Sequence, residues 1–183
     1  MTLNSYLPIY DFIERHELTI RASPALIFHS LKSIDFNRSR IIRTLFRLRG
    51  LQRIASGRKG EEGRVVRLEN FSRTGFILLA ERTNEYIVLG LVGKFWTLNG
   101  GILRLNEKEF IDYHRPGYAK AIWGFELAGD GKEQSSLVTE TRIQLMDEQS
   151  RRRFGIYWGV IAPFSGIIRK EMLRLVKVAA EGE

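Results

Sequence analysis

The sequence predicts an α+β protein in which an antiparallel sheet packs against one long C-terminal helix. Two observations carry this prediction: apolar and polar residues alternate in two neighbouring segments between residues 117 and 147, and an apolar run within residues 151–177 becomes amphipathic. A chain of 183 residues, 44% hydrophobic and 27% charged, is sufficient for one buried core. We therefore expect a single domain over residues 1–183.

The first elements are a strand and two helices. A strand is expected at residues 16–23, where apolar residues alternate with polar ones. Ser23 can cap a helix and Pro24 suits its first position, so a helix is predicted over 24–34. A second, basic helix is expected from about 40 to 52.

The middle of the chain is expected to be mostly strand. The charged, glycine-rich residues 55–64 predict a loop, and residues 100–106 belong to the strand-like region. Residues 75–96 predict a hairpin that bends at Thr83 and Asn84. Its second strand, within 85–96, is apolar on both faces, which is compatible with a homodimer that covers one of them.

Two longer strands are expected over residues 117–129 and 135–147. In the first, Lys120 and Glu126 point away from a row of apolar side chains; in the second, Glu140 points away in the same manner. This pattern predicts antiparallel strands whose outer face is solvated, with Glu140 in a surface charge ladder.

The C-terminal helix raises the question of a membrane. Its uncharged run, Phe154 to Ile168, has 15 residues, fewer than the about 20 that a spanning helix needs. The residues after Arg169 alternate with helical period between apolar and charged. We therefore expect a long helix, kinked at Pro163, that packs on the sheet and does not span a membrane.

Composition and motifs exclude several classes. The net charge of +8 is compatible with an anionic partner, but no zinc, P-loop or dinucleotide motif is present. The absence of cysteine fits a cytoplasmic location, as does the absence of a secretory signal pattern at the N-terminus. No metal or cofactor is expected.

The order of these elements resembles the helix-grip fold of the SRPBCC superfamily, which includes START lipid-transfer domains, the birch-pollen-allergen family and polyketide cyclases. The segment TIRASPALIFHSL resembles the opening strand of that superfamily and the residues that follow it. Four further segments resemble one bacterial branch of it: LLAERTNEYIVLGLVGKFW, FIDYHRPGYAKAIWGFEL, TETRIQ and RRRFGIYWGVIAPFSGIIRKEMLRLVK. The resemblance covers about residues 15–180 and departs from the pattern in the charged insertion within 55–70. It implies a curved sheet wrapped around the last helix, with a cavity for a hydrophobic small molecule.

The cavity walls implied by this resemblance are mostly aromatic. They comprise Phe76, Trp96, Ala121, Trp123, Phe125, Thr139, Thr141, Tyr157, Trp158 and Ile161. Small residues in the same strand and helix, namely Ala119, Ala121, Gly124, Gly155 and Gly159, suggest either close approach or room for a ligand. The alternative is that the rings simply fill the interior.

Candidates for acid–base chemistry are few. His16 is expected before the first strand, His29 on a helix and His114 in a loop near Asp112. No inward-facing carboxylate–histidine group is predicted, and Ser165 lacks the motif of a serine nucleophile.

Arginines of the second helix form one stripe, comprising Arg40, Arg43 and Arg47. The usual role of such a stripe is a solvated face, but here it could form a cavity rim that meets an anionic head group. Specific nucleic-acid binding is not expected, because exposed aromatic residues do not interleave with these arginines.

The leading functional prediction is binding of a hydrophobic or amphipathic small molecule, lipid- or polyketide-like, between the sheet and the last helix. One alternative is an enzyme of the polyketide cyclase/dehydratase type. Another is a regulatory or protein-interaction domain.

Overall fold

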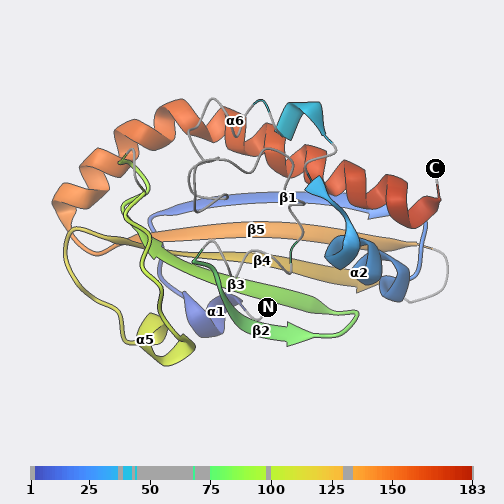
Figure 1. The fold of residues 1–183 in the computed structure, drawn as a ribbon, viewed down its shortest axis with the longest axis horizontal. Coiled ribbons are helices and arrows are strands. Elements are labelled where there is room, and N and C mark those ends of the chain that lie inside the picture. Colours follow the sequence, from blue (N-terminus) through green and yellow to red (C-terminus); the bar gives the residue numbers. More distant parts are fainter. Residues whose placement is uncertain are drawn as a thin grey trace, which may run out of the picture.

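A computed structural model describes residues 3–36, 39–42, 44, 68, 75–97, 100–129 and 134–182. These residues form one antiparallel sheet of five strands. In spatial order the strands are β1 (Phe12–Ile20), β5 (Ser135–Leu145), β4 (Ala119–Gly129), β3 (Tyr86–Gly93) and β2 (Ile77–Arg82). The helix α6 (Glu148–Glu181) runs along the length of the sheet (Figure 1). The predicted α+β class, with the sheet and long C-terminal helix of the helix-grip arrangement, is confirmed.

The first strand begins earlier than predicted. β1 starts at Phe12, so the expected start at residue 16 was wrong by four residues. The helix α2 (Pro24–Ser33) follows, with Ser23 as the N-cap and Pro24 in its first turn as expected. Its buried face, which includes Ile27 and Leu31, packs in one core with the last turns of α6.

The predicted hairpin is also confirmed. β2 and β3 pair antiparallel, and Asn84 adopts the left-handed backbone conformation (φ 65°) at the bend between them. Residues 100–106 form only one bridge to β3, through Leu103, rather than a strand.

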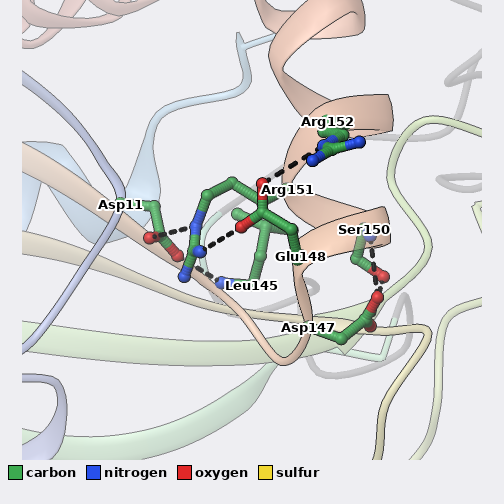
Figure 2. Close-up of polar contacts among 7 residues, drawn as sticks. All are labelled: Asp11, Leu145, Asp147, Glu148, Ser150, Arg151 and Arg152. Atoms are coloured by element: carbon green, nitrogen blue, oxygen red, sulfur yellow. Dashed lines mark hydrogen bonds and ion pairs between the residues drawn. The ribbon is translucent and has the colours of Figure 1, made fainter.

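The start of α6 is fixed by a polar network shown in Figure 2. Asp147 is the N-cap: its carboxylate accepts hydrogen bonds from the Ser150 amide at 2.9 Å and the Ser150 hydroxyl at 2.6 Å. Arg151 donates to Asp11 at 2.8 Å, and Asp11 also accepts from the amide of Leu145 at 2.8 Å. These contacts join the beginning of β1, the end of β5 and the first turn of α6. Pro163 lies within this single helix.

The sheet has two buried faces rather than one. The helix face, which looks toward α6, carries the even-numbered side chains of β1 and the odd-numbered ones of β5, β4 and β3. On the outer face lie the short helices α1 (Leu3–Tyr6) and α5 (Glu107–Ile111), and they cover a second apolar core (Figure 1).

The prediction of a solvated outer face was therefore wrong, although the directions of the side chains were right. Lys120, Glu140 and Arg142 point to the outer face but are only 3%, 4% and 5% exposed. Glu140 accepts a hydrogen bond from Arg142 at 2.6 Å, and Arg142 also donates to Asn4 of α1. Burial lowers the pKa of Lys120, whose ammonium group donates to a backbone carbonyl at 2.9 Å.

The same cover explains why β3 is apolar on both faces. Val88 and Val92 face the core under α1 and α5, whereas Ile87 and Leu89 face the core under α6. The chain thus covers both faces itself, and the feature that suggested a homodimer needs no second subunit.

Two predicted segments lie wholly or mostly outside the described residues. They are the second helix, including Arg43 and Arg47, and the loop at 55–64. Within the described part of the chain, no helix is both long and apolar enough to cross a bilayer.

Candidate functional site

A cluster of polar side chains interrupts the apolar helix face beneath the middle of α6. The register places Glu14 beside Thr141, and Thr141 beside Trp123, in one row across β1, β5 and β4. The next row brings His16 beside Thr139. Charged and hydroxyl side chains therefore meet on the face that otherwise carries core residues.

Glu14 connects the sheet to the helix. Its carboxylate lies 3.0 Å from Nε2 of His16 and accepts a hydrogen bond from the hydroxyl of Ser165 on α6 at 2.7 Å. Gly166 lies directly above: a Cβ atom there would come within 3.4 Å of the Glu14 carboxylate and 3.6 Å of His16 Nε2. These are ordinary van der Waals distances, so α6 packs against the pair at Gly166 without requiring a glycine there. Solvent still reaches both groups, since the side chains of His16 and Glu14 are 19% and 11% exposed.

The two threonines of this cluster differ in their hydrogen bonding. Thr139 accepts from the indole nitrogen of Trp123 at 2.8 Å and donates to the carbonyl of Gly124 at 3.2 Å. Thr141, two residues along the same strand, is buried, and its hydroxyl has no hydrogen-bond partner among the described residues. A buried hydroxyl without a partner is costly, by about 1–3 kcal/mol. Thr141 is therefore a group that a polar ligand atom would satisfy.

Aromatic side chains lie on both sides of the polar cluster. On one side the ring of Trp123 is 4.8 Å from that of Phe125 and 6.1 Å from that of Phe76. The guanidinium group of Arg169 on α6 lies 4.1 Å from the Trp123 ring. A cation over the face of an indole ring is held by electrostatic attraction, so Arg169 brings a positive charge to the ring that donates its N–H to Thr139.

A second aromatic group surrounds Phe154, near the start of α6. The rings of Trp158, Tyr157 and Trp96 lie 5.6, 5.7 and 6.2 Å from it. Ala121 packs against the same group. The aromatic wall residues and Ala121 thus belong to two clusters on the helix face, and along β5 the two threonines lie between Leu137 of the first cluster and Ile143 of the second. Ile161 is partly buried on α6.

Other predicted positions need correction. Gly124 does not belong to the helix face: a Cβ atom there would meet Leu3 of α1 at 2.7 Å, so this glycine allows α1 to pack on the outer face. Among the described residues, Gly155 and Gly159 are not sites of close approach: a Cβ atom at Gly159 would meet none of their atoms within 4 Å, and one at Gly155 only a ring atom of Phe12 at 3.9 Å.

The histidines also separate. His16, expected before the first strand, lies inside β1 and faces α6. The conclusion that no inward-facing carboxylate–histidine group exists was therefore wrong. His29 is exposed on α2, His114 and Asp112 are exposed in the segment between α5 and β4, and Arg40 is exposed.

Two members of the cluster, Glu14 and Ser165, were not predicted as site residues from the sequence. The predicted strand began at residue 16, so the inward direction of Glu14 could not be assigned. The usable signal was the period-two series Phe12, Glu14, His16 and Leu18, in which polar residues occupy two consecutive inward positions.

One small cavity is present on the opposite side of the sheet. Its volume is about 10 Å³, and it is lined by Leu3, Val88, Gly124 and Glu140 among others. That volume corresponds to roughly one water molecule. It is not a site for an organic ligand.

Among the described residues, no group of three or more His, Asp or Glu side chains could hold a metal ion.

Comparison with known proteins gives little information on function. No protein-family model and no curated protein matches the chain. A solved structure of a norcoclaurine synthase point mutant from Thalictrum flavum, in complex with a transition-state analogue, is 12% identical and covers 89% of this chain and 94% of its own, with a TM-score of 0.38. A solved structure of a Thermus thermophilus protein, TTHA0849, is 11% identical and covers 93% of this chain and 95% of its own, with a TM-score of 0.29. Similarity this low carries no conclusion about a ligand or a reaction.

Proposed function

We propose that the protein binds an amphipathic small molecule between the helix face of the sheet and α6. The observation that carries the proposal is the polar cluster of Glu14, His16, Thr141 and Ser165 on an otherwise apolar face, which extends from the edge strand β1 to the neighbouring β5. Cores normally exclude such groups unless every one of them is paired. Thr141, buried without a hydrogen-bond partner among the described residues, is the exception that favours a ligand over a structural role.

The cluster defines the chemistry of the polar end of the ligand. Thr141 can donate to a carbonyl or carboxylate oxygen. Arg169 lies over the ring of Trp123, the register neighbour of Thr141, and its positive charge on the same face favours a ligand with partial or full negative charge. The apolar remainder of the ligand would lie against the rings of Trp123, Phe125 and Phe76. A carboxylic acid or ketone with an aliphatic or polycyclic body fits this description, in agreement with the lipid- or polyketide-like class predicted from the sequence.

A thermal-shift panel of fatty acids and aromatic ketones tests the proposal. A compound that binds the folded state raises the melting temperature by mass action. We expect the shift to be lost in Thr141→Val, because valine cannot donate to the ligand oxygen. Val138→Thr on the outer face of the same strand is the control, and its ligand-induced shift should match that of the wild type. Equal shifts in Thr141→Val and the wild type would refute the proposed site.

A second function, proton transfer, is favoured by the Glu14–His16 pair. In the tautomer of neutral His16 that carries its proton on Nε2, this N–H donates a hydrogen bond to Glu14 at 3.0 Å. Nδ1 then carries no proton and can act as a base. His16 would remove a proton from the carbon beside a bound ketone, with Thr141 donating a hydrogen bond to the ketone oxygen. A β-hydroxyl group would then leave as water after receiving that proton, which is the reaction of a cyclase/dehydratase.

The variant His16→Gln separates the two functions. An enzyme would lose turnover of a β-hydroxy ketone while its ligand-induced thermal shift persists. A binding protein would show no turnover in either form. Turnover that is unchanged in His16→Gln would exclude His16 as the base.

Membership of the SRPBCC superfamily is part of the same proposal, supported by the segments that resemble it and by the helix-grip arrangement. A cytoplasmic location and a homodimer stay predictions from the sequence. A role of Arg40, Arg43 and Arg47 as a basic rim also stays a prediction.

A further inference from the structure

The outer side of α6 carries an apolar stripe that no other described part of the protein covers. Ile156 and Val160 are 77% and 64% exposed, and Phe164 and Ile167 are 41% and 47% exposed. Their spacings of four, four and three residues place all of them within about 80° of the helix circumference at about 100° per residue. The stripe extends over about 16 Å of helix. A row of this kind differs from single exposed apolar residues, which are common on protein surfaces.

Positive charge borders this stripe at both ends. Arg152 and Arg153 precede it by one turn, and Lys170 and Arg174 follow it. Arg152 pairs with Glu148 at 3.2 Å and Arg174 with Glu171 at 2.8 Å. Arg153 and Lys170 are exposed and make no ion pair with any described residue. From residue 149 to 170 the helix sequence contains five basic residues and no acidic one.

This combination discriminates between possible partners. A second copy of the chain that packed its α6 antiparallel on this stripe would bring Arg153 close to Lys170 of the other copy, and parallel packing would bring each cation close to its own counterpart. Both arrangements are repulsive. A membrane surface that contains anionic lipids satisfies both features, because apolar side chains enter the acyl boundary while the flanking cations meet phosphate groups.

We infer that α6 docks the protein on the surface of an anionic phospholipid membrane through Ile156, Val160, Phe164 and Ile167. The helix lies in the plane of the interface and does not enter as a span, in keeping with its inward face being occupied by the sheet. This surface is separate from the proposed ligand site, which lies on the opposite side of α6. Docking does not depend on that site being occupied.

Vesicle flotation tests the inference directly. The wild-type protein should float with vesicles of phosphatidylcholine mixed with phosphatidylglycerol, and only weakly with vesicles of phosphatidylcholine alone. The double variant Ile156→Ser/Phe164→Ser should bind at least about tenfold more weakly because it loses apolar contact with the acyl region. Arg153→Gln and Lys170→Gln should each weaken binding about fivefold, and rising salt should weaken wild-type binding. Leu26→Ser on α2 and Arg82→Gln on β2, both exposed positions, are the matched controls and should bind like the wild type.

The absence of cysteine allows a second readout. An environment-sensitive fluorophore on Val160→Cys should shift to the blue on the anionic vesicles, whereas the same label on Ile111→Cys, on α5 across the sheet, should not. The inference would be overturned if the wild type failed to bind anionic vesicles or if both labels responded alike. A stable dimer in solution that Ile156→Ser/Phe164→Ser converts to monomer would also overturn it, because a second copy would then cover the stripe.

Discussion

Thr139 and Thr141 offer a comparison in which one substitution is expected to act in opposite directions at two positions. Both side chains point to the helix face from β5, and both are buried. In Thr139→Val the indole N–H of Trp123 loses its acceptor at 2.8 Å, which should destabilise the protein by about 1–3 kcal/mol. In Thr141→Val no hydrogen bond is lost among the described residues, and the desolvation cost of the unpaired hydroxyl disappears. We expect Thr141→Val to be more stable than the wild type by about 1–2 kcal/mol.

Equilibrium unfolding in urea measures both effects in the ligand-free protein. For a chain of this size, 1 kcal/mol corresponds to roughly 2–4 °C in melting temperature, so Thr141→Val should melt about 2–8 °C above the wild type and Thr139→Val below it. The variants must have the same dependence on urea concentration as the wild type, because a changed slope would indicate a changed structure. A Thr141→Val protein that is less stable than the wild type would refute the reasoning, since its hydroxyl would then have a partner in the folded protein.

Three further predictions concern the N-cap of α6, the buried ion pair on the outer face of the sheet and a glycine within α6. Hydrogen bonds from Ser150 and Gly117 hold the pKa of Asp147 at about 2, below its ordinary value of 3.8. The ionised carboxylate therefore stabilises the folded state above about pH 4, and this stabilisation is lost as the pH falls toward 2. Asp147→Ala should lower the free energy of unfolding in urea by about 1 kcal/mol at pH 7 and remove this pH dependence. Glu140→Gln should cost about 3–5 kcal/mol, since it leaves the buried charge of Arg142 without a carboxylate. Arg142→Met should cost less, because Glu140 keeps Arg15 at 3.8 Å. The double variant should cost less than the sum of the two, and strict additivity would contradict the buried pair. Gly159→Ala should stabilise α6 by about 1 kcal/mol in thermal unfolding, because the new methyl group meets no atom of the described residues within 4 Å; destabilisation would show that another group lies there.

The regular parts of this fold were accessible from the sequence because they are long and strongly periodic. The alternation in β4 and β5, the bend at Asn84 and the capped start of α2 at Ser23 each correspond to a local physical rule, and the structure confirms them. The amphipathic second half of α6 likewise identified the face that packs on the sheet.

Burial on the outer face was not accessible in the same way. The period of β4 and β5 indicates which side chains share a face, but not what covers that face. The cover comes from α1, with four residues, and α5, with five, and helices this short have no detectable period. Lys120 and Glu140 were therefore assigned to the correct side and given the wrong environment.

The polar cluster was missed for a different reason. His16, Glu14 and Ser165 come from two elements that lie about 150 residues apart in the sequence, and only the packing of α6 on β1 brings them together. The alternation of side-chain direction along a strand would have assigned Glu14 and His16 to the helix face if the predicted strand had begun at Phe12. The contact with Ser165 needed the three-dimensional structure.

The central claim is that the helix face holds the polar end of a small molecule at Thr141. Native mass spectrometry of the protein purified without denaturation, followed by solvent extraction, tests it most directly. We expect one bound carbonyl or carboxylate compound per chain in the wild type and in Val138→Thr, and the bare chain in Thr141→Val. A bare wild-type chain that no compound of the panel converts to a complex would contradict it, as would the same bound molecule in Thr141→Val.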